Sequence, residues 1–182
     1  MIEREYKFLL TENKFSAILE RAKGLYGKPK EKTQQNHYYD NETLSLNSCG
    51  VTVRLRQANG IGKLQIKRHN GETNGYAVSE ETEQSIEGIP TEIVLPEFGL
   101  LRLKGGLTTH RCSFFVCENI SLDMDENTYL GLTDYEAEIE FDDNAQNRAE
   151  RIMLAMGLDT ANRENKSARF FSAFERTEFY EV

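Results

Sequence analysis

The stretch Tyr135-Glu-Ala-Glu-Ile-Glu-Phe141 alternates strictly between two kinds of side chain. Its odd-numbered residues are Tyr, Ala, Ile and Phe, and every residue between them is Glu. Because successive side chains of a strand point to opposite faces, the stretch predicts a strand with one apolar and one acidic face. The same period of two recurs in Ile2–Phe8, Val51–Arg56 and Lys63–Lys67, and it predicts further strands of this kind.

The charged faces of these strands have an unusual composition. Glu is depleted in ordinary strands, yet here it recurs two residues apart in three segments, and Arg or Lys recurs two or four residues apart in two others. Like charges along one strand repel unless opposite charges lie between them. A sheet with one solvated face is the simpler interpretation. A closed barrel is the alternative, because it sets acids and bases opposite each other around a lumen. The repeats are Glu3/Glu5, Glu81/Glu83, Glu138/Glu140, Arg54/Arg56 and Lys63/Lys67.

The barrel alternative corresponds to a fold class of α+β and mainly β: a closed antiparallel barrel with helices packed outside. A barrel of about eight strands has room for one small ligand. Clustered carboxylates bind hard divalent cations such as Mg²⁺, and clustered Arg and Lys bind phosphate oxygens. A lumen that holds both kinds of charge therefore suits a metal-bound polyphosphate.

Three helices and several turns complete the expected fold. Thr11 is positioned to cap a helix that stops at Gly24, and Asn144 to cap a second that stops at Gly157. The third is expected from Lys166 to Arg176, and a short helical turn from Thr91 to Leu95. Glycine-containing stretches predict the hairpin turns of the sheet. They are 59–62, 70–71, 104–106 and 125–131.

Composition excludes several classes of protein. The 182 residues predict one domain, 1–182, and 22 basic against 30 acidic residues give a net charge of −8. This charge argues against nucleic acid or an anionic membrane as partner. The chain starts with charged residues and has no apolar run of about 18 residues, so we expect no signal segment and no membrane helix. Three cysteines without a CxxC pair favour a reducing, cytoplasmic setting over a disulfide framework.

The charged segments, in their order, resemble the CYTH domains, also called triphosphate tunnel metalloenzymes. Glu3-Arg-Glu5-Tyr-Lys7 resembles the family's N-terminal ExExK signature, Arg54-Leu-Arg56 its RxR strand, and Lys63–Lys67 the Lys strand that follows. Asn165–Phe170 resembles the C-terminal segment of the small bacterial YjbK-like branch. The resemblance covers nearly the whole chain. Its other matching segments are Gln35–Asp40, Gly106–Arg111, Leu122–Asp123, Tyr129–Gly131 and Asp134–Glu140.

The resemblance implies a closed eight-stranded tunnel in which a triphosphate and a divalent metal, Mg²⁺ or Mn²⁺, are bound. It implies metal-dependent hydrolysis of inorganic triphosphate, or of an organic triphosphate such as thiamine triphosphate or a nucleoside triphosphate. We assign Glu3, Glu5, Glu138 and Glu140 to the metal site. Glu81, Glu83 and Asp123 are candidate catalytic residues, and Glu136 is expected at the tunnel mouth. The candidate phosphate ligands are Lys7, Arg54, Arg56, Lys63, Lys67, Arg111, Lys166 and Arg169.

Other functions remain open at this point. The 3′-hydroxyl of ATP could replace water as nucleophile, as in a class IV-type adenylate cyclase that makes cyclic AMP. A module that binds nucleotide or polyphosphate without turnover is a second alternative. Lys166 and Arg169 could close one end of the tunnel or lie on a solvated helix face. Which of Glu80, Glu81 and Glu83 face inward is open, and so is the choice between monomer and homodimer.

Overall fold

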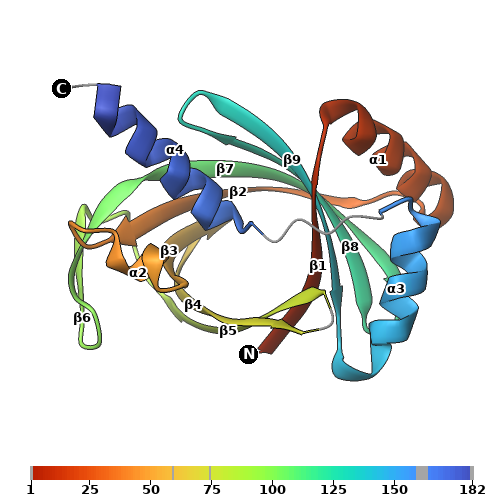
Figure 1. The fold of residues 1–182 in the computed structure, drawn as a ribbon, viewed down its shortest axis with the longest axis horizontal. Coiled ribbons are helices and arrows are strands. Elements are labelled where there is room, and N and C mark those ends of the chain that lie inside the picture. The colour runs from red at the N-terminus through yellow and green to blue at the C-terminus, as the bar shows by residue number, and fades with distance from the viewer. Residues whose placement is uncertain (1, 59, 74, 159–163, 181–182) are drawn as a thin grey trace.

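The computed structural model describes residues 2–58, 60–73, 75–158 and 164–180. Strands predominate, and the helices follow the first strand, the second strand and the end of the sheet (Figure 1). In chain order the elements are β1 (Ile2–Leu10), α1 (Glu12–Tyr26), β2 (Lys30–Asp40), α2 (Ser45–Ser48), β3 (Val51–Ala58), β4 (Ile61–Thr73), β5 (Tyr76–Ser85), β6 (Glu92–Leu95), β7 (Gly99–Cys117), β8 (Ile120–Tyr129), β9 (Leu132–Phe141), the 3₁₀ helix η1 (Asp143–Ala145), α3 (Gln146–Ala155) and α4 (Lys166–Tyr180).

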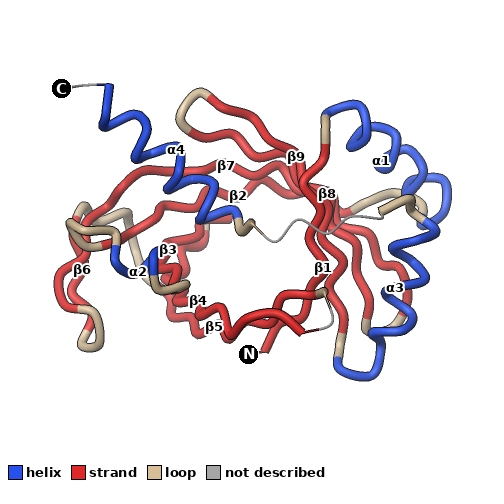
Figure 2. Tube along the Cα trace, viewed as in Figure 1, coloured by secondary structure: helices blue, strands red, loops and turns tan. Residues whose placement is uncertain are grey.

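Eight strands close into an antiparallel barrel in the order β2-β3-β4-β5-β1-β9-β8-β7 (Figure 2). Pairing of β7 with β2 completes the ring, and β6 extends the sheet from the beginning of β7. The predicted eight-stranded closed barrel is confirmed. Between β1 and β9 the register sets Glu5 opposite Glu140 and Lys7 opposite Glu138, so these charged side chains share the inner face.

The apolar residues that alternate with these charges point outward and form the main core. Tyr6 and Phe8 of β1 and Ile139 of β9 are buried against Ile18 of α1 and Ala149 of α3. This core explains why the charges can face inward: the helices remove the outer faces of β1, β8 and β9 from water. At the start of α1, the Thr11 hydroxyl accepts a hydrogen bond from the amide of Lys14, as predicted.

The helix limits differ in detail from the predictions. α1 continues past Gly24 and ends at Tyr26, where Gly27 has a φ of 80°. Asn144 lies inside η1, so it does not cap α3, which begins at Gln146. The segment predicted as a helical turn, Thr91 to Leu95, contains strand β6, because the β7 edge pairs with Glu92–Leu95. α2 was not predicted.

Two of the predicted turns lie within strands, and a third, 125–131, turns only at its end. The segments 70–71 and 104–106 are irregularities in β4 and β7, where the register against the partner strand shifts. Gly105 has a φ of 147°, and a Cβ there would lie 3.0 Å from the ring of Phe170, so glycine lets α4 approach the barrel. The segment that begins at Asp125 turns only after Tyr129. Asp and Asn are frequent in turns, but Asp125 and Asn127 are buried inward-facing residues of β8.

α4 covers one rim of the barrel. Phe170 of α4 packs on Tyr38 of β2 at a centroid distance of 4.8 Å and on Tyr129 of β8 at 6.3 Å. Because β8 ends at Tyr129, its first residue, Ile120, lies at the opposite rim, where β1 begins and β9 ends. We call these the α4 rim and the β1 rim. Among the described residues, no helix combines the length and apolarity needed to cross a membrane.

Candidate active site

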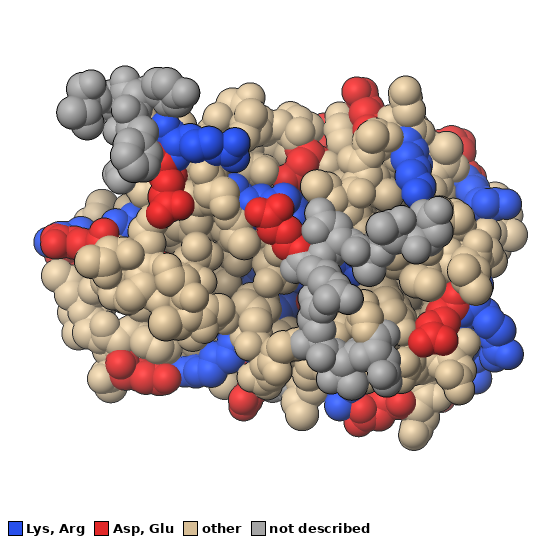
Figure 3. All heavy atoms as spheres, in the orientation of Figure 1, with Lys and Arg blue, Asp and Glu red and all other residues tan. Residues whose placement is uncertain are grey.

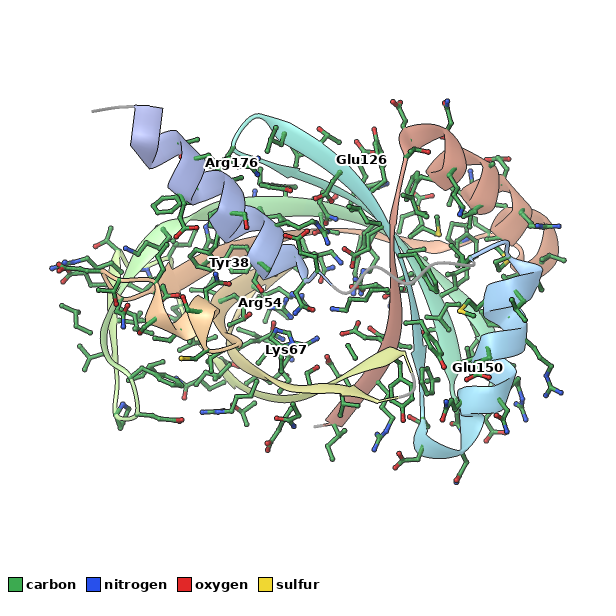
Figure 4. The ribbon with its side chains drawn as sticks, in the orientation of Figure 1. Tyr38, Arg54, Lys67, Glu126, Glu150 and Arg176 are labelled. Carbon is green, nitrogen blue, oxygen red and sulfur yellow. The ribbon has the colours of Figure 1, made fainter. Side chains whose placement is uncertain are left out.

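The barrel interior has two walls of opposite charge around one cavity. Carboxylates come from β1, β8 and β9. Arg54 and Arg56 come from β3, and Lys67 of β4 reaches the carboxylates of β1. Figure 4 shows Arg54 and Lys67 pointing into the ring, and Figure 3 shows Lys and Arg atoms inside the hollow below α4. The cavity is lined by Glu3, Glu5, Lys7, Thr52, Arg54, Arg56, Lys67, His69, Arg111, Glu138, Glu140, Asn165, Lys166 and Ser167.

Three of the four predicted metal ligands converge. One carboxylate oxygen from each of Glu5, Glu138 and Glu140 lies within 4.8 Å of the others. Burial would raise the pKa of Glu5, but Lys67 and Lys7 lower it to about 2. Burial likewise opposes ionisation of Glu138, and Lys166 and Arg111 outweigh it and lower its pKa. Two members of the cluster are therefore ionised at neutral pH.

Glu140 differs from the other two. Burial and the neighbouring carboxylates Glu138, Asp123 and Glu5 raise its pKa to about 7. No cation of the described residues lies within ion-pair distance of Glu140. An all-oxygen donor set with one uncompensated carboxylate fits a hard divalent cation, because the missing positive charge is what an ion would supply.

Glu3, the fourth predicted ligand, lies at the edge of this cluster. Its carboxylate accepts a hydrogen bond from Lys67 Nζ at 2.7 Å, and Lys67 also donates to Glu5 at 3.0 Å. Lys7 Nζ lies 3.0 Å from Glu5 and donates to the amide oxygen of Asn165 at 3.1 Å. Lys67 therefore joins β4 to the carboxylates of β1, and Lys7 joins β1 to the segment that precedes α4.

Arg54 and Arg56 form the basic wall on β3. The Arg54 guanidinium donates to Gln65 at 2.9 Å and to Glu81 at 3.2 Å. Arg56 donates to the amide oxygen of Asn36 at 2.9 Å, and no described carboxylate lies within ion-pair distance of it. Burial, Arg54 and a second neighbouring arginine lower the pKa of Arg56 to about 10. Arg56 is thus a cation whose counter-charge an anionic ligand could provide.

The three predicted catalytic residues lie on two different walls of the barrel. Glu81 and Glu83 share the inner face of β5, whereas Glu80 points outward and is exposed. Glu81 and Glu83 are therefore the two that face the tunnel. Glu83 is at an exposed position, where it pairs with Lys63. Asp123 lies on the other wall and pairs with Arg111, and burial raises its pKa.

The remaining predicted phosphate ligands are occupied by protein carboxylates. Arg111 pairs with Asp123, with Asp125 at 2.5 Å and with Glu138 at 2.5 Å. Lys166 Nζ lies 2.7 Å from Asp125, 2.9 Å from Glu136 and 2.8 Å from Glu138. Together these pairs neutralise most of the acidic wall and attach the first turn of α4 to it.

Arg169 continues this network along α4. It donates to Asp134 at 2.8 Å and pairs with Glu136. Lys166 and Arg169 are both buried, so the alternative of a solvated helix face is wrong. Glu136 lies toward the α4 rim, as its place near the start of β9 predicts, but its side chain is buried because α4 covers that rim and both α4 cations contact it.

The family model of the CYTH domain matches residues 1–171. The chain belongs to the CYTH family. No curated protein compared with this CYTH protein matches it.

Solved structures share the fold of this CYTH protein. A candidate adenylate cyclase from Bacillus halodurans is 24% identical, with a TM-score of 0.72 over 92% of this chain and 96% of the other. HpAC1 from Hippeastrum, a candidate adenylyl cyclase described as having a dominant triphosphatase activity, is 21% identical, with a TM-score of 0.75 over 93% and 95%. The Mimivirus capping enzyme triphosphatase is 13% identical, with a TM-score of 0.61 over 87% and 90%.

Sequence reasoning missed several cavity residues of this CYTH protein. Asp125 was assigned to a turn, although its parity with Asp123 was a usable signal. Lys32 lies opposite Arg111 on the inner face of β2, and burial and Arg111 lower its pKa. His69 lines the cavity next to Thr52, and burial and Lys67 lower its pKa to about 4. Its parity with Lys67 indicated this position.

We expect Arg111→Met to destabilise the fold strongly. The variant would leave Asp123, Asp125 and Glu138 without their shared cation inside the barrel. Removing one partner of a buried ion pair costs about 3–5 kcal/mol, which for a chain of this size lowers the melting temperature by about 10 °C. Thermal unfolding followed by circular dichroism measures this. The control is Arg102→Met, at a half-exposed site, with an expected change of about 0.5 kcal/mol or less. Equal melting temperatures for the two variants would contradict the role of Arg111.

Proposed function

We propose that the protein hydrolyses a terminal phosphoanhydride bond of a triphosphate in a reaction that depends on Mg²⁺ or Mn²⁺. The observation that carries the proposal is the facing of two incomplete sites across one cavity. Among the described residues, Glu140 of the carboxylate cluster has no cation within ion-pair distance, and Arg56 has no carboxylate within ion-pair distance. A triphosphate with a bound divalent cation supplies both missing charges at once.

Glu5, Glu138 and Glu140 would hold the metal, with Glu3 beside them. When bound, the metal neutralises charge on phosphate oxygens and orients the triphosphate. Arg54 and Arg56 of β3, together with Lys7 and Lys67 beside the carboxylates, would bind phosphate oxygens. They would stabilise the charge that spreads over the transferred phosphoryl group.

The remaining assigned residues take supporting roles. Lys63 is half-exposed and would contact the substrate as it enters the tunnel. Arg111, Lys166 and Arg169 would hold the carboxylates of the acidic wall in position through their ion pairs. Asp123 has a raised pKa and lies beside the metal cluster, which suits it to orient or deprotonate the attacking water. Glu81 positions Arg54 through its hydrogen bond, and Glu83 does the same for Lys63.

The relatives favour phosphoanhydride chemistry. HpAC1 and the Mimivirus enzyme are described as triphosphatases, and the protein from Bacillus halodurans as a candidate adenylate cyclase. Hydrolysis and cyclisation can use the same protein groups to hold the metal and the phosphates. In hydrolysis, water attacks the terminal phosphate and releases phosphate, whereas in cyclisation the 3′-hydroxyl attacks the α-phosphate of ATP and releases pyrophosphate. Adenylate cyclase activity is therefore the alternative that the experiment must separate.

We expect phosphate release from inorganic triphosphate, and from ATP or thiamine triphosphate, with Mg²⁺ or Mn²⁺ and not with a chelator. Phosphate release and cyclic AMP are measured in the same reactions. Cyclic AMP with little free phosphate from ATP would replace hydrolysis by cyclisation. Triphosphate binding that raises the melting temperature without either product would show a binding module, and release that persists in chelator would contradict the metal site.

A further inference from the structure

Lys32 is an inward-facing cation with no role in the proposed function. It lies opposite Arg111 where β2 pairs with β7, and residues directly opposite each other in antiparallel strands share a face. Arg111 lines the cavity and pairs with Glu138 there. The half-buried side chain of Lys32 therefore faces the tunnel beside Arg111.

Lys32 has no counter-charge of its own. Within the part of the chain that the structure describes, no carboxylate lies within ion-pair distance of it. Asp123 and Asp125 are the carboxylates whose charge favours its protonated form, and both are paired with Arg111. Burial, Arg111 and Arg56 lower the pKa of Lys32. A partly desolvated cation without a partner is unfavourable, so this position favours a bound anion.

Arg56 shares this property, and the other tunnel cations do not. Arg111 acts on both Lys32 and Arg56 and lowers the pKa of each. Lys32, Arg56 and Arg111 are thus neighbouring cations from β2, β3 and β7, and the first two have no carboxylate partner among the described residues. The tunnel cations that do have one within ion-pair distance are Lys7, Arg54, Lys63, Lys67, Arg111, Lys166 and Arg169.

The two unpaired cations lie toward the β1 rim. Lys32 is two residues from the start of β2, and Arg56 is two residues from the end of β3. Both strand ends lie at the β1 rim, because β2 begins beside the last part of β7, which turns there into β8. At the α4 rim, Lys166 and Arg169 are already paired with carboxylates. Unpaired positive charge on the β2–β3 side is therefore available to an anion that enters or leaves by the β1 rim.

Inorganic phosphate and the terminal phosphate of a triphosphate suit these cations best. At neutral pH such a group carries about −1.5 to −2 charges, because its second pKa is about 6. An internal phosphate of the chain carries a single charge. The Lys32 ammonium and the Arg56 guanidinium are donors only, and a tetrahedral phosphate can accept hydrogen bonds from both. The most highly charged end of the substrate therefore matches the least compensated cations of the tunnel.

We propose that Lys32 is a phosphate ligand, and that Lys32 and Arg56 together hold the terminal phosphate of the triphosphate and then the orthophosphate that hydrolysis releases. The inference rests on the proposed function and extends it, because it assigns a further binding residue and the rim by which the product leaves. In the reaction, the oxygen of water forms a bond to the terminal phosphorus while the bond from this phosphorus to the bridging oxygen breaks. Diphosphate keeps the bridging oxygen, and one proton of the water is released. Orthophosphate therefore forms against Lys32 and competes there with the next triphosphate.

The first measurement uses orthophosphate in chelator, so that it needs neither metal nor turnover. Thermal unfolding of the wild type, Lys32→Met and Lys23→Met is followed in potassium phosphate and in potassium chloride of equal ionic strength. Phosphate should raise the melting temperature of the wild type and Lys23→Met more than that of Lys32→Met. Lys23 is the matched control, because it lies on the outer helix α1 and pairs with Glu20. Without phosphate, Lys32→Met should unfold at the wild-type temperature or slightly above it, since it loses a cation without a counter-charge.

The second measurement is the consumption of inorganic triphosphate with Mg²⁺, followed by ion chromatography at several concentrations of added orthophosphate. Orthophosphate should compete with triphosphate in the wild type. Lys32→Met should raise both the inhibition constant of orthophosphate and the KM for triphosphate about tenfold, since a charge-assisted hydrogen bond contributes this much to affinity. Lys32→Arg keeps the charge and should restore most of both values.

The outcomes separate this inference from the proposed function. If the wild type consumes triphosphate but phosphate stabilises Lys32→Met as much as Lys23→Met, the proposed function stands and the assignment of Lys32 is wrong. Inhibition by orthophosphate that does not compete with triphosphate would also overturn the shared site. If no triphosphate is consumed, the proposed function fails. A phosphate effect that still requires Lys32 would then support the anion site and overturn its assignment to substrate and product.

Discussion

The Glu140→Gln variant is expected to lose catalysis while its fold becomes more stable. Glu140 belongs to the three-carboxylate cluster and has no cation of the described residues as partner. Loss of a residue that only hydrogen-bonds to a metal ligand lowers metal affinity or activity by about 10–100-fold. Loss of a ligand carboxylate should therefore lower the rate of metal-dependent phosphate release by about 100-fold or more. The measurement is the initial rate of phosphate release over a range of Mg²⁺ concentrations.

The difference in stability between the wild type and Glu140→Gln should depend on pH, and its sign can be worked out. Burial and the neighbouring carboxylates raise the pKa of Glu140 from its ordinary value of 4.5 to about 7 in the folded protein. The folded state therefore binds more protons than the unfolded state between these values, and wild-type stability falls as the pH rises through this window. Glutamine does not titrate. Without metal, the variant should equal the wild type near pH 4.5 and exceed it by about 1–2 kcal/mol at pH 8.

Chemical denaturation in chelator at several pH values measures this difference. Glu80→Gln is the matched control, because Glu80 lies on β5 with its side chain exposed outside the barrel. Saturating Mg²⁺ should reverse the order and make the wild type the more stable protein, since only it retains the full ligand set. If Glu140→Gln is less stable than the wild type at pH 8 without metal, the carboxylate is not electrostatically uncompensated and the proposed metal site is wrong.

Arg56→Gln should abolish tight binding of the triphosphate with little change in folding. Arg56 contacts Asn36 and has no described carboxylate within ion-pair distance, whereas Arg54 and another arginine lower its pKa to about 10. Its charge is therefore unfavourable in the ligand-free fold and favourable once phosphate oxygens lie opposite it. Loss of one partner of a desolvated charge pair corresponds to about 100-fold in kcat/KM.

The expected effect on the free energy of unfolding differs between Arg56 and Arg111. Glutamine at position 56 can keep a hydrogen bond to Asn36 and relieves the repulsion by Arg54, so the free energy of unfolding should stay within about 1 kcal/mol of the wild type. Arg111→Met is the contrast, since the same change in charge there is expected to destabilise the fold. Steady-state kinetics with inorganic triphosphate and urea unfolding give the two quantities. An unchanged KM for Arg56→Gln would remove Arg56 from the phosphate site.

The sequence by itself determined the periodicity and therefore the two faces of each strand. Alternation in Ile2–Phe8 and Tyr135–Phe141 requires the charges to share a face, whatever the strand order is. The core positions Phe8 and Ile139 and the cap at Thr11 followed from local rules. The presence of both signs of charge on these faces predicted a lumen, and the family resemblance added eight strands and a triphosphate.

Only the tertiary structure decided which charges meet. Register and barrel closure place Lys166, from the far end of the chain, against Asp125, Glu136 and Glu138, so a predicted phosphate ligand is paired within the protein. Within the described part of the chain, they leave Glu140 and Arg56 without such partners, although both belong to the same repeats as paired residues. Coulomb interactions depend on distance and burial, and sequence separation fixes neither. For this reason the residues were predictable as a class, and their individual roles were not.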